Sequence, residues 1–226
     1  MNAPAAAAAC AVLLALSSVA VTLDQVDDFE DGTTMGWSEG VASPNPPVNV
    51  ASGGPAGTND NYLGNTSSGT FGAGSRMVMF NTAQWAGNYA TAGVALLTAD
   101  MANLGGATLH MRIAIEGAGT RYGSTLPVVI SNDSAWHAVS LPVDEAGLSV
   151  VEGAQPLAVV LSNVTELRIL SSQGGPAWLG DSIAGVLGMD NLAAVIPEPA
   201  AAGAAALLLL VRVHRPHCKF RPVLLQ

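Results

Sequence analysis

The chain has 226 residues, of which 50% are hydrophobic and only 11% are charged, with 25 glycines and 13 prolines. This length is enough for a buried core, and the hydrophobic content excludes an acidic disordered chain. Gly and Pro exceed their ordinary frequency without a collagen-like pattern, which favours a turn-rich β protein. The formal net charge is −9, and residues 21–197 hold four arginines against sixteen acidic residues. Such a surface repels a phosphate backbone, so we expect no nucleic-acid partner.

The two cysteines, Cys10 and Cys218, both lie in terminal segments. The central region has no thiol, which excludes a disulfide-stapled scaffold.

The N-terminal segment, residues 1–20, is typical of a secretory signal peptide. An apolar run extends from Ala5 to Leu16, and the small residues Ser18 and Ala20 stand three positions and one position before the expected cut. The run is shorter than the roughly 20 residues that a membrane-spanning helix needs. The pattern therefore indicates export.

The C-terminal segment, residues 196–226, contains a proline-rich breaker, an apolar run and a basic cluster. Pro197, Glu198 and Pro199 precede the apolar stretch Ala200–Val211, and four basic residues follow it. Basic residues favour the cytoplasmic side, so we expect transient membrane anchoring with the N-terminus outside. The alternative is a buried C-terminal helix.

This C-terminal layout resembles the PEP-CTERM sorting signal of exported bacterial proteins. The resemblance implies that Pro197, Glu198 and Pro199 form the motif recognised by a membrane-embedded exosortase, which removes the tail. Export to the cell envelope, the cell surface or the extracellular space follows as the expected localisation.

Strand signals dominate residues 21–195. Within Ala107–Glu116, hydrophobic residues alternate with His110, Arg112 and Glu116, which predicts a strand with one buried face. Further strands are expected at Met77–Phe80, Val94–Thr98, Val128–Ile130, His137–Val143, Leu157–Leu161, Leu167–Leu170 and Met189–Val195. One helical turn is expected within 83–102, and long loops over 42–74. Short strands separated by turn residues predict a sandwich or a barrel.

Asp27–Trp37 resembles the opening strand of jelly-roll, galactose-binding-like modules, and Gly188–Leu192 resembles their closing strand. Residues 74–81, 136–137 and 163–170 are similar to segments of exported PEP-CTERM proteins with this domain. The resemblance implies an all-β, antiparallel jelly-roll β-sandwich.

Catalytic motifs are missing from the sequence: it contains no G-x-S-x-G elbow, no phosphate-binding loop and no H-E-x-x-H zinc motif. Glycoside hydrolysis needs two spaced carboxyl groups, and no pair is singled out by the sequence. The available acids are Glu116, Asp144, Glu145, Glu152 and Glu166. We therefore expect a non-enzymatic protein.

Aromatic residues provide candidates for sugar binding, because sugar rings stack on exposed aromatic rings. Trp85 and Tyr89 lie among amide side chains, and Tyr122 lies between glycine-containing segments. These three are our predicted ligand-binding residues, with core packing as the alternative for Trp85. Core packing is the expectation for Trp37, Trp136 and Trp178.

Five acids cluster near the beginning of the predicted domain: Asp24, Asp27, Asp28, Glu30 and Asp31. The spacing does not match an EF-hand, because Phe29 falls where a ligand is required. The cluster is either a solvated strand or a structural calcium site. In jelly-roll modules the first and last strands often pair, and the resemblance implies Glu30 and Asp190 as calcium ligands, with Asp28 a weaker candidate.

These observations predict an exported, non-enzymatic protein of the cell surface or extracellular matrix. The alternative is a carbohydrate-binding module for exopolysaccharide, and a polysaccharide hydrolase is the third possibility.

Overall fold

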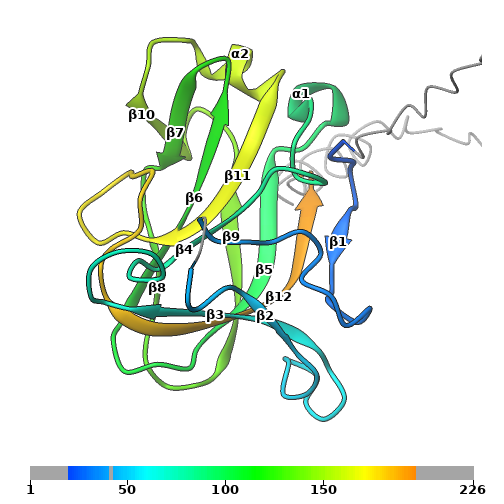
Figure 1. The fold of residues 1–226 in the computed structure, drawn as a ribbon. Helices are drawn as coiled ribbons and strands as arrows, with labels where there is room; N and C mark the ends of the chain where they lie inside the picture. The colour runs from blue at the N-terminus through cyan, green and yellow to red at the C-terminus, as the bar shows by residue number, and fades with distance from the viewer. Residues whose placement is uncertain (1–19, 41–42, 197–226) are drawn as a thin grey trace, which may run out of the picture. The chain divides into compact units, whose positions relative to one another are not determined.

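The computed structural model describes residues 20–40 and 43–196. These residues form an all-β sandwich of two antiparallel sheets (Figure 1), which confirms the predicted fold class. The predicted signal peptide and sorting segment lie outside the described residues, apart from the boundary residues Ala20 and Ile196. The sorting motif Pro197, Glu198 and Pro199 is among the residues that are not described. Within the described residues, none of the helices has the length and apolar character needed to cross a membrane.

Sheet A has the strand order β2-β3-β12-β5-β9, and β1 also pairs with β12. Its strands are β1 (Val26–Asp27), β2 (Val48–Val50), β3 (Tyr62–Ser68), β5 (Leu96–Asn103), β9 (Trp136–Pro142) and β12 (Ala184–Val195).

Sheet B has the strand order β10-β7-β6-β11-β4, and β8 also pairs with β6. Its strands are β4 (Val78–Asn81), β6 (Leu109–Gly117), β7 (Thr120–Ser124), β8 (Val128–Ile130), β10 (Leu148–Glu152) and β11 (Val164–Ser171).

The core lies between the two sheets, and β6 shows how the sequence creates it. Its alternate residues are fully buried and pack into the main hydrophobic cluster: Leu109, Met111, Ile113 and Ile115. Burying each such side chain contributes about 1.5–3 kcal/mol. The intervening residues of β6 point to the outer face of sheet B, as the period-2 pattern predicts.

The first and last strands pair, as expected: Val26 lies opposite Ala193, and Asp27 opposite Leu192. The preceding part of β12, from Ala184 to Met189, pairs with β3 along the same edge of the strand. The edge of β12 therefore changes partner at Asp190 and Asn191. A register irregularity with β5 falls at the same place.

Two short helices, α1 (Tyr89–Ala92) and α2 (Leu157–Leu161), lie at one end of the sandwich (Figure 1). The Asn88 side chain caps α1, which confirms the expected helical turn. The strand predicted at Leu157–Leu161 is wrong, because this segment is α2. Its buried residues, Leu157 and Val160, are three positions apart, a helical spacing, and Pro156 precedes the first helical residue.

The predicted loop over 42–74 contains β2 and β3, so that prediction is wrong as well. The inward positions of β3 include Asn65 and Ser67, which conceal the hydrophobic alternation of a strand. Ser67 donates from Oγ to the carbonyl of Ile183 at 2.6 Å, so this buried hydroxyl has a partner.

Candidate functional site

A row of charged side chains crosses the outer face of sheet B. Glu152 of β10 lies opposite Arg121 of β7, which lies opposite Glu116 of β6, which lies opposite Glu166 of β11. Residues that oppose each other on antiparallel strands share one face of the sheet. The register therefore places the four charges side by side across four strands.

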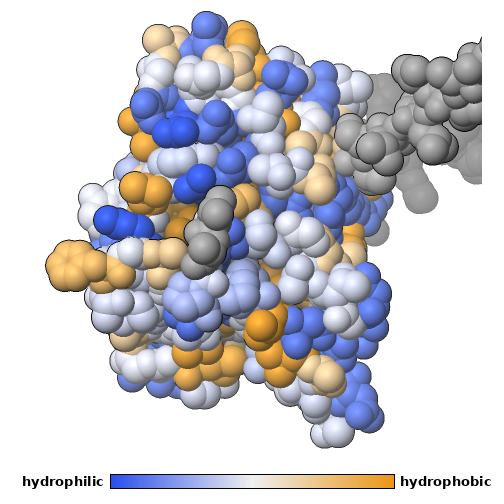
Figure 2. Space-filling view, in the orientation of Figure 1, coloured by the Kyte–Doolittle hydropathy of each residue, from blue (hydrophilic) through white to orange (hydrophobic). Residues whose placement is uncertain are grey.

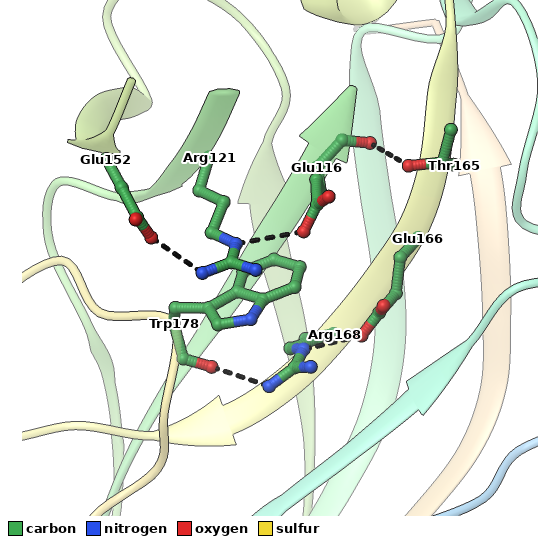
Figure 3. Close-up of polar contacts among 7 residues, drawn as sticks. All are labelled: Glu116, Arg121, Glu152, Thr165, Glu166, Arg168 and Trp178. Carbon is green, nitrogen blue, oxygen red and sulfur yellow. Dashed lines mark hydrogen bonds and ion pairs between the residues drawn. The ribbon is translucent and has the colours of Figure 1, made fainter. Parts of the chain in front are cut away.

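Trp178, from the loop between β11 and β12, packs on the outer face of sheet B beside this row of charged side chains. It forms a small hydrophobic cluster with Ala114 and Leu170, outside the main core, and is 8% exposed. Its ring contacts two guanidinium groups, with the Cζ atom of Arg168 at 3.8 Å and that of Arg121 at 4.5 Å from the ring centroid. The indole lies between the two groups in Figure 3. Such cation–π contacts fix the position of both arginines.

Ion pairs hold the same two arginines from the side (Figure 3). Arg121 donates from Nε to Glu116 at 2.9 Å and from Nη1 to Glu152 at 2.6 Å. Arg168 donates from Nε to Glu166 at 2.6 Å and from Nη1 to the carbonyl of Trp178 at 3.0 Å. We call these six residues, Glu116, Arg121, Glu152, Glu166, Arg168 and Trp178, the Trp178 face.

The Trp178 face combines fixed hydrogen-bond donors with fixed acceptors. The side chain of Arg121 is 33% exposed and that of Glu116 29%, so both can still reach a ligand. Each guanidinium has five N–H groups, and the recorded bonds use two of them. Each carboxylate can accept more than one hydrogen bond. Sugar hydroxyls both donate and accept, and this arrangement suits them chemically.

The sequence did not predict the Trp178 face. Trp178 was expected in the core, whereas it is buried on the outer side of a sheet. The polar alternation along β6 and β11 was visible, but the pairing that joins Glu116 to Arg121 and Glu166 depends on the tertiary fold. The Gly-Gly-Pro-Ala-Trp sequence at 174–178 gave the one local signal, an aromatic residue in a turn-rich loop.

The structure contradicts the prediction that Trp85 and Tyr89 bind sugar, because both are 0% exposed. Trp85 donates from Nε1 to Oδ2 of Asp27 at 2.7 Å, and Trp37 donates to the same oxygen at 2.7 Å. Burial raises the pKa of Asp27, while these hydrogen bonds oppose that shift. Trp85 thus takes the alternative role in the core, where the buried carboxylate Asp27 joins two indoles.

Tyr122 is also in the core rather than in a loop. It lies on β7, is 8% exposed, and donates from its hydroxyl to the carbonyl of Gln155 at 3.0 Å. The prediction of Tyr122 as a stacking platform is therefore wrong. Its neighbour in the chain, Arg121, faces outward and contacts Trp178.

Of the predicted calcium ligands Asp28, Glu30 and Asp190, Asp190 lies where β12 changes partner. Asp190 is 1% exposed, and both its oxygens accept hydrogen bonds from Asn191. Burial, together with the charges of Asp60, Asp100 and Glu30, raises its pKa from 3.8 to about 7. In contrast, Asp28 is exposed and accepts from the backbone N–H of Glu30. In residues 20–40 and 43–196, no three His, Cys, Asp or Glu side chains are arranged to hold a metal ion.

Comparison with known proteins concerns the fold. No protein-family model matches the chain, and no curated protein matches it. Among solved structures, an exo-β-agarase is similar with a TM-score of 0.56 and 10% identity, over 79% of this chain and 25% of the agarase. This chain therefore spans about a quarter of that enzyme.

A family 11 carbohydrate-binding module from Clostridium thermocellum, solved with a β-1,3-1,4-mixed-linked tetrasaccharide, is also similar. Its TM-score is 0.50 with 14% identity, over 78% of this chain and 96% of the module. The described residues thus have the β-sandwich architecture of this carbohydrate-binding module. At such identities the likeness shows the fold alone.

Proposed function

We propose that the protein is a non-catalytic carbohydrate-binding protein and that it binds polysaccharide on the Trp178 face. The observation that carries this proposal is the row of Arg and Glu side chains held rigid by ion pairs and by Trp178. Side chains ordered before binding lose little conformational entropy when a ligand arrives. The similarity in fold to a carbohydrate-binding module supports the proposal independently.

The chemical class of the ligand follows from charge. The two arginines of the Trp178 face are matched by three glutamates, so the face carries no net positive charge. Residues 20–196 contain four arginines against sixteen acidic residues, a net charge of −12. This protein would repel a polyanion at long range. We therefore infer a neutral polysaccharide.

Polysaccharide hydrolysis is the rival function, since Glu116 and Glu166 lie opposite each other on β6 and β11. A glycoside hydrolase needs one carboxyl group as proton donor. Glu116 accepts from Arg121 and Glu166 accepts from Arg168, so neither is arranged to give a proton to a leaving group. Binding fits this geometry better than catalysis does.

We also retain structural calcium as a proposal. Asp190 lies where β12 changes partner, and the negative charges of Asp60, Asp100 and Glu30 act on its carboxyl group. Hard cations favour such oxygen donors. A cation at this place would offset the repulsion among the acids and join the chain ends, with no role in chemistry.

Export and sorting complete the proposal. The residues that predict a signal peptide and a PEP-CTERM signal lie outside the described residues. A polysaccharide-binding protein at the cell surface would meet its ligand there, with an exosortase as its processing partner. The function would then be attachment to extracellular polysaccharide.

Affinity electrophoresis of the full-length chain tests this function. Native gels would contain soluble β-1,3-1,4-mixed-linked glucan, no polysaccharide, or alginate as a polyanion, and a parallel assay would use agarose beads. We expect retardation in the glucan gel or retention on agarose, and none with alginate. Unchanged migration in the glucan gel, together with no retention on agarose, would contradict the proposal.

A further inference from the structure

An aromatic pair lies on the outer face of sheet A, on the opposite side of the sandwich from the Trp178 face. Trp136 of β9 and Tyr62 of β3 have ring centroids 5.3 Å apart, with an angle of 76° between the ring planes. On the molecular face that Figure 2 shows, hydrophobic side chains are dispersed among hydrophilic ones. The Trp136–Tyr62 pair instead gathers two rings at one place. Both side chains are half-buried, so each ring keeps part of its surface in contact with solvent.

The strands beneath Trp136 carry no large side chains. The register places Trp136 opposite Ala102 of β5, and Ala102 opposite Gly188 of β12. A Cβ atom at Gly188 would lie 2.9 Å from Cη2 of Trp136, so only a glycine there leaves room for the indole. Trp136 also donates from Nε1 to the carbonyl of Gly53 at 3.0 Å. The indole is therefore held against the sheet before a ligand arrives, which lowers the entropic cost of binding.

Small and polar side chains lie beside the indole on the same face. Ala138 and Ser140 follow Trp136 at the alternate positions of β9, which share its face, and both are exposed. Asp100 of β5 lies opposite Ala138, is half-buried and accepts from Nδ2 of Asn191 at 3.1 Å. This face thus combines an accessible aromatic ring with open space, a hydroxyl and a carboxylate. A sugar ring needs the same groups, an apolar surface for stacking and partners for its hydroxyls.

The charges around the pair exclude an anionic ligand. Asp100 lies opposite Asp190 on β12, and the charge of Asp60 also acts on Asp190. The arginines of residues 20–196, in contrast, all lie on or next to strands of sheet B: Arg76, Arg112, Arg121 and Arg168. A polyanion would therefore be repelled from sheet A. The sugar class that suits this face is neutral, as on the Trp178 face.

We propose that Trp136 and Tyr62 form a second platform for neutral polysaccharide, and that the protein bridges two polysaccharide chains. One chain lies on the Trp178 face, and the other stacks on Trp136, with Asp100 accepting from its hydroxyls. Sheets A and B are the two layers of the sandwich (Figure 1), and the outer faces of two layers point away from each other. Bridging rests on the proposed binding at the Trp178 face and adds cross-linking as a further function.

Agglutination of polysaccharide-coated beads by the full-length chain tests the bridging. Beads coated with mixed-linked glucan or with agarose are mixed with the protein, and light scattering follows their clumping. Clumping should rise and then fall with protein concentration, because excess protein occupies each chain separately. Trp136→Ala and Tyr62→Ala should each need about tenfold more protein or fail to clump the beads, because losing one of two linked contacts removes the avidity. Native glucan gels should still retard Trp136→Ala through the Trp178 face.

Three further measurements control this test. Val159→Ala removes a 41%-exposed hydrophobic side chain on α2, at one end of the sandwich, and should clump the beads as the wild type does. Trp136→Phe keeps an aromatic ring and should keep most of the clumping. Melting curves show which variants are folded, and Tyr62→Ala decides the outcome if Trp136→Ala is unfolded.

The outcomes separate the bridging from the wider function. If neutral polysaccharide retards the wild type but no beads clump, the second platform is wrong while the proposed function stands. The same holds if folded Trp136→Ala clumps the beads as the wild type does. If the wild type binds none of the polysaccharides, both proposals are wrong. If folded Trp136→Ala is no longer retarded while Arg168→Gln is retarded as the wild type is, the glucan binds on sheet A alone, which overturns the bridging.

Discussion

The Cζ atom of Arg168 lies 3.8 Å from the centroid of the Trp178 ring. The contact joins two elements that are consecutive in the chain, β11 and the loop that follows it, across the outer face of sheet B. Arg168 donates to the Trp178 carbonyl as well, so the same residue holds both the ring and the backbone of that loop. The position of Trp178 and the shape of the charged row therefore depend on each other.

Substitutions at Trp85 should reduce stability and leave glucan binding intact. Trp85→Ala removes a fully buried ring and should lower the free energy of unfolding by roughly 3–5 kcal/mol. Trp85→Phe keeps most of the ring but loses the hydrogen bond to Asp27, which should cost about 1.5–3 kcal/mol. Urea unfolding of both variants measures this. The control is Trp136→Phe, because Trp136 is half-buried on β9 rather than in the core, where the sequence predicted it, and donates only to the Gly53 carbonyl. Weaker glucan binding by folded Trp85→Phe would restore a role in the ligand site.

The stability of the protein in chelator should depend on the ionisation of Asp190. Its pKa is raised from 3.8 to about 7, so the folded state binds this proton more tightly than the unfolded state does. The carboxyl group of Asp190 therefore adds to the free energy of unfolding below pH 4, and this stabilisation is lost as the pH rises toward 7. Relative to Asp190→Asn, the wild type should lose up to about 4 kcal/mol across this window. Urea unfolding at several pH values gives the difference, and parallel curves for the two proteins would contradict it.

Calcium should offset this loss of wild-type stability at pH 7. A cation beside Asp190 and Glu30 favours the ionised carboxylates and binds the folded state, so millimolar calcium should raise the melting temperature of the wild type. Asp190→Asn should lose this response, and Asp28→Asn should keep most of it, because Asp28 is the weaker candidate. Differential scanning fluorimetry with calcium and with chelator makes the comparison. A wild-type melting curve that neither reagent shifts would contradict the calcium site.

The sequence predicted those parts of the fold that depend on local alternation. Leu109 to Ile115 alternate strictly, and β6 has the predicted faces. β3 was missed because Asn65 and Ser67 replace inward hydrophobic residues, and α2 was misassigned because a five-residue apolar run fits a strand or a helix equally well. The Trp178 face could not be predicted, because its charged row exists only after β7, β6 and β11 pair. Trp85 was misplaced because its buried partner, Asp27, is 58 residues away in the chain.

The sorting proposal predicts the mass of the mature protein. Cleavage after Ala20 and removal of the tail near Pro199 should leave a chain that begins near Val21 and lacks Arg212 to Gln226. Mass spectrometry of the protein recovered from the cell surface or the medium measures both ends. A mature protein that retains Lys219 and Gln226 would contradict exosortase processing.

Polysaccharide binding by the Trp178 face is the central claim, and isothermal titration with soluble mixed-linked glucan tests it most directly. If the glucan binds the wild type, Arg168→Gln should weaken affinity at least tenfold, about 1.4 kcal/mol. Glu152→Gln removes one exposed ion pair, worth about 0.2–1 kcal/mol of stability, and should weaken binding without unfolding the protein. Val159→Ala should bind as the wild type does. Wild-type affinity in folded Arg168→Gln and Glu152→Gln would show that the glucan does not bind on this face.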